Sequence, residues 1–200
     1  MLESYTYEPG GYTYIPEIYD RIKQRIDLML AQHCKVLFVR FDVRFPQGKV
    51  HRGKNEEISW LMKALMSYYY DHGVAAHYIW AREQCNSDAP HYHVIFLLNG
   101  SRVQNPMGVW TKAAEIWSGI TNGSPALVQQ CWAKPIGRDF TGGIMIRRPP
   151  GTAVGHDLVE QQQAYEYAYG AALGWGAYLA KECSKDNTPF GVRRFGSSQL

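Results

Sequence analysis

The segment that most constrains the fold is residues 91–98, which read His-Tyr-His-Val-Ile-Phe-Leu-Leu. A short apolar run of this kind is typical of a buried strand. Side chains alternate between the two faces of a strand, so His91 and His93 lie side by side on one face. Imidazole is a common ligand of divalent metals. The segment therefore predicts a strand that begins at a pair of metal-ligating side chains.

A second strand pattern precedes the histidines and ends in a carboxylate. Residues 75–83 end at Glu83, and the polar residues 84–90 that follow are typical of a hairpin connection. An antiparallel hairpin returns Glu83 to the histidines, so we expect Glu83, His91 and His93 to bind a metal. Gln84 and Asp42 are alternatives for the third ligand, since Asp42 lies on a neighbouring predicted strand.

The remaining periodicity predicts an α+β fold with a single antiparallel sheet and helices packed on a face. In residues 35–45 the apolar side chains alternate with Arg40, Asp42 and Arg44, which predicts a half-buried strand whose charged side is open. Residues 140–155 are dense in Gly and Pro and are expected to form a surface loop. Further helices are expected at 16–33, 56–71, 106–118 and 157–183, and a further strand at 127–132. Residues 1–34 would form an N-terminal arm and helix, and 35–200 the main domain, in one globular unit.

A tyrosine and a lysine form the second candidate group. Tyr178 and Lys181 are three residues apart in a predicted helix, so they share a helix face. A phenol beside an ammonium and near a metal suits nucleophilic attack on a phosphodiester. The residues three and four positions from Tyr178 include no second tyrosine, which favours a single catalytic tyrosine.

Charge and composition limit which binding partners and which cellular compartment are expected for the protein. The net charge is only +3, but residues 35–54 hold six basic side chains against one acidic one. Local patches of this kind bind phosphates. We expect DNA contacts from two groups of basic residues. The first group is Arg40, Arg44, Lys49 and Arg52, and the second is Arg147 and Arg148. There is no secretion signal and no apolar run of about 18 residues, and the four cysteines are far apart, so we expect a cytoplasmic protein with reduced thiols and no membrane partner.

These motifs, in this order, resemble the HUH endonucleases, and most closely the gene-two-protein-like replication initiators of filamentous phages and prophages. The resemblance covers roughly residues 35–198. It is carried by 82–84 (Arg-Glu-Gln), 90–95 (Pro-His-Tyr-His-Val-Ile), 178–181 (Tyr-Leu-Ala-Lys) and 193–198 (Arg-Arg-Phe-Gly-Ser-Ser).

The resemblance implies a sheet of about five strands, with the histidine pair on a central strand and the tyrosine helix lying over it. It also implies a site-specific nicking enzyme and strand transferase that uses Mg²⁺ or Mn²⁺ and forms a 5′-phosphotyrosine. The substrate would be single-stranded or hairpin DNA at a rolling-circle replication origin, and the partners a host helicase and replication machinery. Two alternatives stay open: a metal-dependent phosphohydrolase that uses water, and a non-catalytic module that binds single strands.

Overall fold

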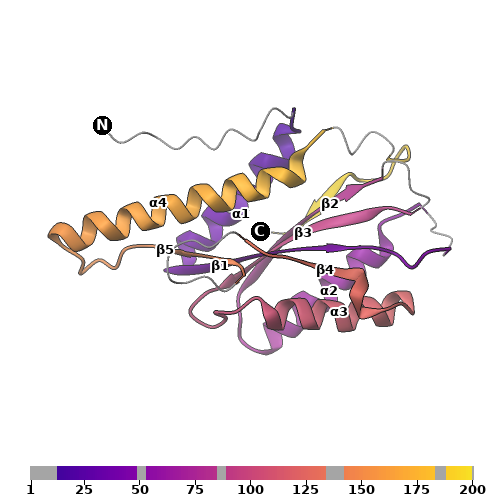
Figure 1. The fold of residues 1–200 in the computed structure, drawn as a ribbon, viewed down its shortest axis with the longest axis horizontal. Helices are drawn as coiled ribbons and strands as arrows, with labels where there is room; N and C mark the ends of the chain where they lie inside the picture. The colour runs from indigo at the N-terminus through magenta and orange to yellow at the C-terminus, as the bar shows by residue number, and fades with distance from the viewer. Residues whose placement is uncertain (1–12, 49–52, 85–88, 134–141, 183–187, 200) are drawn as a thin grey trace.

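A computed structural model describes residues 13–48, 53–84, 89–133, 142–182 and 188–199. Within these residues the predicted α+β class is confirmed: one antiparallel sheet of six strands, with helices packed against it (Figure 1). The strands are β1 (Lys35–Val43), β2 (Ala76–Glu83), β3 (His91–Asn99), β4 (Val128–Cys131), β5 (Ile144–Arg147) and β6 (Phe195–Ser197). The helices are α1 (Pro16–Gln32), α2 (Glu56–Asp71), α3 (Met107–Thr121) and α4 (Gly155–Ala177), with short 3₁₀ turns at Pro125–Leu127 and Tyr178–Ala180.

The strand order is β4-β1-β3-β2-β6, and β5 pairs with β1 on the same edge as β4. The apolar strand β3 is therefore central, flanked by β1 and by its hairpin partner β2. Two short strands were not expected. β5 lies inside the segment 140–155 that we predicted to be a loop. It pairs with residues 35–38 of β1, which provide backbone hydrogen-bond partners for its four residues.

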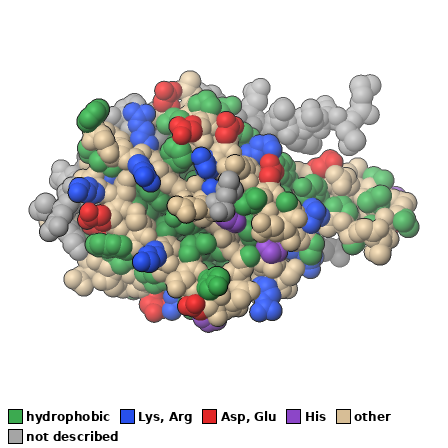
Figure 2. Space-filling view, turned by 180° about the vertical axis from the view of Figure 1, so that it is seen from behind, with side chains coloured by type: hydrophobic (Ala, Val, Ile, Leu, Met, Phe, Trp, Pro, Cys, Tyr) green, Lys and Arg blue, Asp and Glu red, His purple; other side chains and the backbone are tan. Residues whose placement is uncertain are grey.

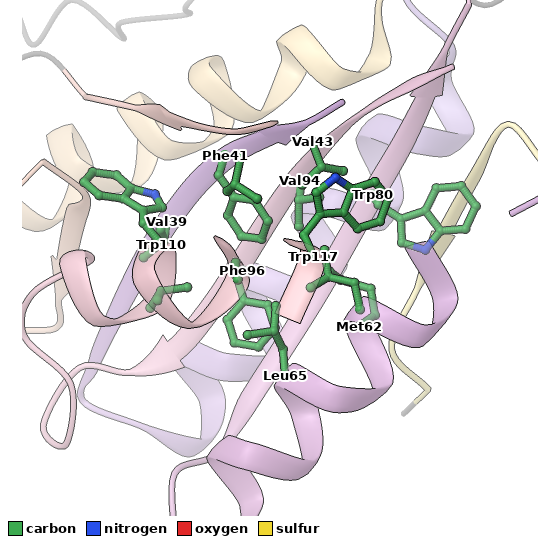
Figure 3. Packing of buried hydrophobic residues seen from close by; sticks show 14 of the residues in the cluster. Val39, Phe41, Val43, Met62, Leu65, Trp80, Val94, Phe96, Trp110 and Trp117 are labelled. Carbon is green, nitrogen blue, oxygen red and sulfur yellow. The ribbon is translucent and has the colours of Figure 1, made fainter. Parts of the chain in front are cut away.

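Helices cover both faces of the sheet, whereas the sequence predicted an open face on β1. Helices α2 and α3 pack on one face, where Val39, Phe41, Trp80, Phe96 and Trp117 form part of the core (Figure 3). Helices α1 and α4 pack on the other, in a second core that includes other side chains of β1, β2 and β3. The alternation along β1 was read correctly, but its charged side is buried, because a second helical layer lies over it.

Helix α1 is an integral part of this second core, where its apolar side chains are buried against the sheet. Helix α4 begins beyond the edge of the sheet, where its first ten residues are exposed, and then runs across the sheet so that its C-terminal end is packed (Figure 1). No helix among the described residues is long and apolar enough to cross a membrane.

Candidate metal centre and tyrosine site

The register of the three central strands gathers the polar side chains at one end of the sheet. Glu83 pairs with His91 across β2 and β3, and Asp42 pairs with His93 across β1 and β3. Residues directly opposite each other in an antiparallel pair project to the same face. All four side chains therefore lie on the α1/α4 face, at the ends of β1 and β2 and at the start of β3.

Three ligand atoms converge there. The Nε2 atoms of His91 and His93 lie 3.0 Å and 2.9 Å from the same Glu83 oxygen, Oε2. One ligand atom from each residue lies within 4.8 Å of the others. His93 is 3% exposed, and its Nε2 makes no hydrogen bond within the described residues despite the short approach to Glu83. A divalent cation would satisfy this buried nitrogen, so the donor set of two imidazoles and a carboxylate fits Mg²⁺ or Mn²⁺.

Asp42 lies behind His93 and fixes its orientation. His93 Nδ1 donates a hydrogen bond of 2.6 Å to Asp42 Oδ1, which leaves the Nε2 lone pair aimed at the proposed cation. Burial alone would lower the pKa of His93, but the hydrogen bond to Asp42 and the negative charges of Asp42 and Glu83 outweigh burial and raise it. Burial would raise the pKa of Asp42, and His93 together with Arg40 brings it below its usual value. The acidic surroundings that favour a proton on His93 also favour a metal cation.

Of the three candidates for the third ligand, the structure groups Glu83 with the histidines. Gln84 is turned away, because its Oε1 accepts a 2.7 Å hydrogen bond from the Arg82 side chain on the opposite face. Asp42 acts through His93, as an outer-shell carboxylate does in many metal sites. Sequence analysis placed Asp42 near the site but could not show this hydrogen bond, which depends on β1 lying beside β3.

Tyr178 lies directly over the histidines. Its ring packs edge-on against the His93 ring, with centroids 5.3 Å apart and an interplanar angle of 87°. The Tyr178 side chain is 39% exposed, so a ligand can reach the phenol from solvent. Lys181 Nζ lies 3.9 Å from the centroid of the Tyr178 ring. The predicted nucleophile and its lysine are thus beside the predicted metal ligands.

The local structure that joins Tyr178 to Lys181 differs from the prediction. Helix α4 ends at Ala177, and Tyr178–Ala180 is a 3₁₀ turn, where side chains at positions i and i+3 eclipse each other. Residues before α1 hold this turn in place. The amide of Ile15 donates to the Ala180 carbonyl at 2.7 Å, so the N-terminal segment forms part of the tyrosine site.

The basic residues predicted to contact DNA are separated by the structure. Arg44 is exposed just past the end of β1, near the metal centre, whereas Arg40 is buried beneath the ring of Tyr178. Arg147 and Arg148 are exposed at the opposite end of β1, where Arg147 pairs with Lys35. Seven residues of β1 separate that point from Asp42, or roughly 23 Å.

Two further residues in this group, Lys49 and Arg52, lie outside the described residues. On the face seen in Figure 2, Lys and Arg side chains are dispersed among Asp and Glu and form no continuous basic patch. The exposed trio His156, Asp157 and Glu160, at the start of α4, has metal-ligand spacing that the sequence reasoning missed. Exposed acidic groups of this kind are common without a metal, so the trio carries no assignment.

Comparisons with known proteins place the whole chain in one family. No curated protein and no solved structure matches the chain. The model of the YagK/YfjJ C-terminal domain family matches residues 5–198, which include every side chain of the metal centre and the tyrosine turn. The protein therefore belongs to the YagK/YfjJ C-terminal domain family.

Proposed function

We propose that the protein is a metal-dependent endonuclease of the HUH type that cuts single-stranded DNA through a covalent bond to Tyr178. The observation that carries the proposal is the edge contact between the Tyr178 and His93 rings. It places a solvent-accessible phenol next to two imidazoles and a carboxylate that converge on one point.

Each side chain has a defined task in this reaction. His91, His93 and Glu83 hold the cation, which when bound supplies Lewis acidity toward a phosphate oxygen. Tyr178 Oη forms a bond to phosphorus as the bond from phosphorus to the 3′-oxygen breaks. The phenol proton passes to solvent, and the departing 3′-oxygen takes a proton from water. Lys181 places a positive charge beside the phenol, where it stabilises the negative charge that develops during attack.

The form of the substrate follows from the position of the site. The phosphate must reach a phenol that lies between the end of α4 and the sheet, and a single strand can bend into this space more easily than a duplex. We therefore propose single-stranded or hairpin-flanked DNA as the substrate, with replication initiation of a phage or mobile element as the cellular role. The partners would be a host helicase and the replication machinery.

The test is the formation of a protein–DNA adduct. The protein is incubated with labelled single-stranded DNA and Mn²⁺, resolved on a denaturing gel, and digested for mass spectrometry. We expect a labelled adduct on Tyr178 that disappears in Tyr178→Phe and after chelation of the metal. Tyr167→Phe is the matched control, because Tyr167 is an exposed tyrosine on α4, about three helical turns before the turn that holds Tyr178.

Three other results would contradict the proposal. Cut DNA without an adduct would indicate a hydrolase that uses water. Binding without cutting, with or without metal, would indicate a non-catalytic single-strand-binding module. Full activity after simultaneous replacement of His91 and His93 by Ala would exclude the metal centre as the site.

A further inference from the structure

Arg40 is a buried cation for whose guanidinium no hydrogen bond is found among the described residues. It lies on β1, two residues before Asp42, and is 7% exposed. Its Nε is buried and has no hydrogen-bond partner within the described residues. The nearest carboxylate oxygen, Asp42 Oδ1, lies 3.9 Å from an Arg40 terminal nitrogen and already accepts the His93 hydrogen bond. Removing a charge from water is costly unless it is closely paired, and Arg40 has only a long ion pair with a carboxylate that His93 already engages, so its donors have capacity for a further anion.

The other buried arginines of the described residues show what a structural role looks like. Arg82 is 0% exposed and donates to the Asn55 side chain at 3.0 Å and to Tyr92 Oη at 3.1 Å, as well as to Gln84. Arg25 donates to the Ser198 carbonyl. These two guanidinium groups tie segments of the chain together. The Nε atoms of Arg25 and Arg82 are also unpaired within the described residues, but both side chains donate hydrogen bonds from a terminal nitrogen. No such bond from Arg40 is found within that part of the chain, so its burial needs another explanation.

The surroundings of Arg40 point to that explanation. Its Cζ lies 4.3 Å from the centroid of the Tyr178 ring and 5.8 Å from that of Trp175. The two rings hold the cation beside the phenol by cation–π attraction. Because the guanidinium lies against the Tyr178 ring, we expect a phosphate bound at the phenol to reach the Arg40 donors, and a guanidinium matches the oxygens of a phosphate better than any other side chain does.

We propose that Arg40 binds the phosphodiester that Tyr178 attacks, so that the substrate phosphate occupies guanidinium donors for which the free protein offers only the long ion pair with Asp42. The inference rests on the proposed function and adds a phosphate-binding residue to the same site. It also revises the expected role of Arg40: in place of a DNA contact on an open strand face, it holds the reacting phosphate from beneath the tyrosine.

The test observes Arg40 itself, without cleavage. The Nε–Hε resonance of Arg40 is assigned by its absence in Arg40→Lys and by contacts with the Trp175 ring. The metal-free wild-type protein is then titrated with an oligothymidylate of about six nucleotides, a length that fits one single-strand site. A matched titration uses the uncharged methylphosphonate analogue. We expect a saturable shift of the Arg40 resonance with the phosphodiester and none with the analogue.

Variants add an affinity measurement. Loss of a charge-assisted, two-donor contact should weaken phosphodiester binding by about tenfold or more in Arg40→Lys. Arg102→Lys, which changes an exposed residue just past the end of β3 that lies opposite the metal centre, should bind as the wild type does. An Arg40 resonance that stays unmoved at saturation, or an Arg40→Lys affinity equal to that of the wild type, would overturn the inference. If Arg40→Lys does not fold, the wild-type titration decides alone.

The two proposals fail separately. An adduct on Tyr178 together with an unresponsive Arg40 would refute the phosphate-binding role and leave the nicking activity in place. A phosphate-dependent shift of Arg40 without any adduct would support the anion site and refute the nicking activity.

Discussion

Two glycines of helix α4 should respond in opposite ways to the same substitution. Gly170 and Gly176 are both inside α4, but a Cβ added at Gly170 meets nothing within 4 Å. A Cβ added at Gly176 would lie 2.9 Å from Ile22 Cγ2, 3.4 Å from Ile95 Cδ1 and 3.8 Å from Phe38 Cε2. At Gly176 the helix therefore approaches α1 and the sheet more closely than an alanine allows, whereas at Gly170 it has room.

The magnitudes follow from two opposing effects. Glycine in a helix interior is less favourable than alanine by about 1 kcal/mol, so Gly170→Ala should raise the free energy of unfolding by about that amount. At Gly176, the second-last residue of α4, at most the same gain applies, but overpacking a core typically costs about 1–3 kcal/mol. We expect Gly176→Ala to be destabilised by about 1 kcal/mol, which places it about 2 kcal/mol below Gly170→Ala.

Urea denaturation monitored by circular dichroism measures this difference. Both variants should keep the wild-type dependence on urea, so that the midpoints report stability alone. Because Gly176 lies two residues before Tyr178, Gly176→Ala should also slow adduct formation, whereas Gly170→Ala should not. Equal stabilisation of the two variants would refute the close approach of α4 to the sheet and would weaken the placement of Tyr178 that depends on it.

Three further predictions concern the metal, pH and salt. Asp42→Asn removes the charged acceptor behind His93, so calorimetric titration should show Mn²⁺ affinity lowered by about 10- to 100-fold; unchanged affinity would exclude the outer-shell role. Burial, Arg25 and His33 lower the pKa of His77, so at this residue the unfolded chain takes up a proton first, and the contribution of His77 to stability falls as pH drops below about 6.5. His77→Gln should lose less stability than the wild type between pH 7.5 and 5.5 in parallel denaturations, and an equal loss would contradict the shift. Arg44→Ala should reduce the salt slope of single-strand binding by about 1, whereas Arg102→Ala, at the opposite end of β3, should leave it unchanged; equal slopes would show that both ends of the sheet bind DNA.

The sequence alone determined the elements that rest on local periodicity. The alternation in residues 91–98 predicted β3 and placed His91 and His93 on one face, and the short connection predicted the hairpin that sets Glu83 opposite His91. Both features are short-range, because the period of a strand and the length of a turn fix them before any distant contact forms. The chain order also predicted the antiparallel α+β class.

Tertiary structure decided which distant segments meet. The pairing of β1 with β3 brings Asp42 to His93, and no local pattern encodes which strand lies beside another. Arg40 was expected at the surface but is buried, because α1 and α4 cover its face of the sheet. Periodicity shows which residues share a face but not what lies over that face. Strands β5 and β6 are too short to produce a periodic signal and form only because longer strands offer them backbone partners. The end of α4 at Ala177 is likewise set by contacts, since the turn that presents Tyr178 is held by the segment before α1.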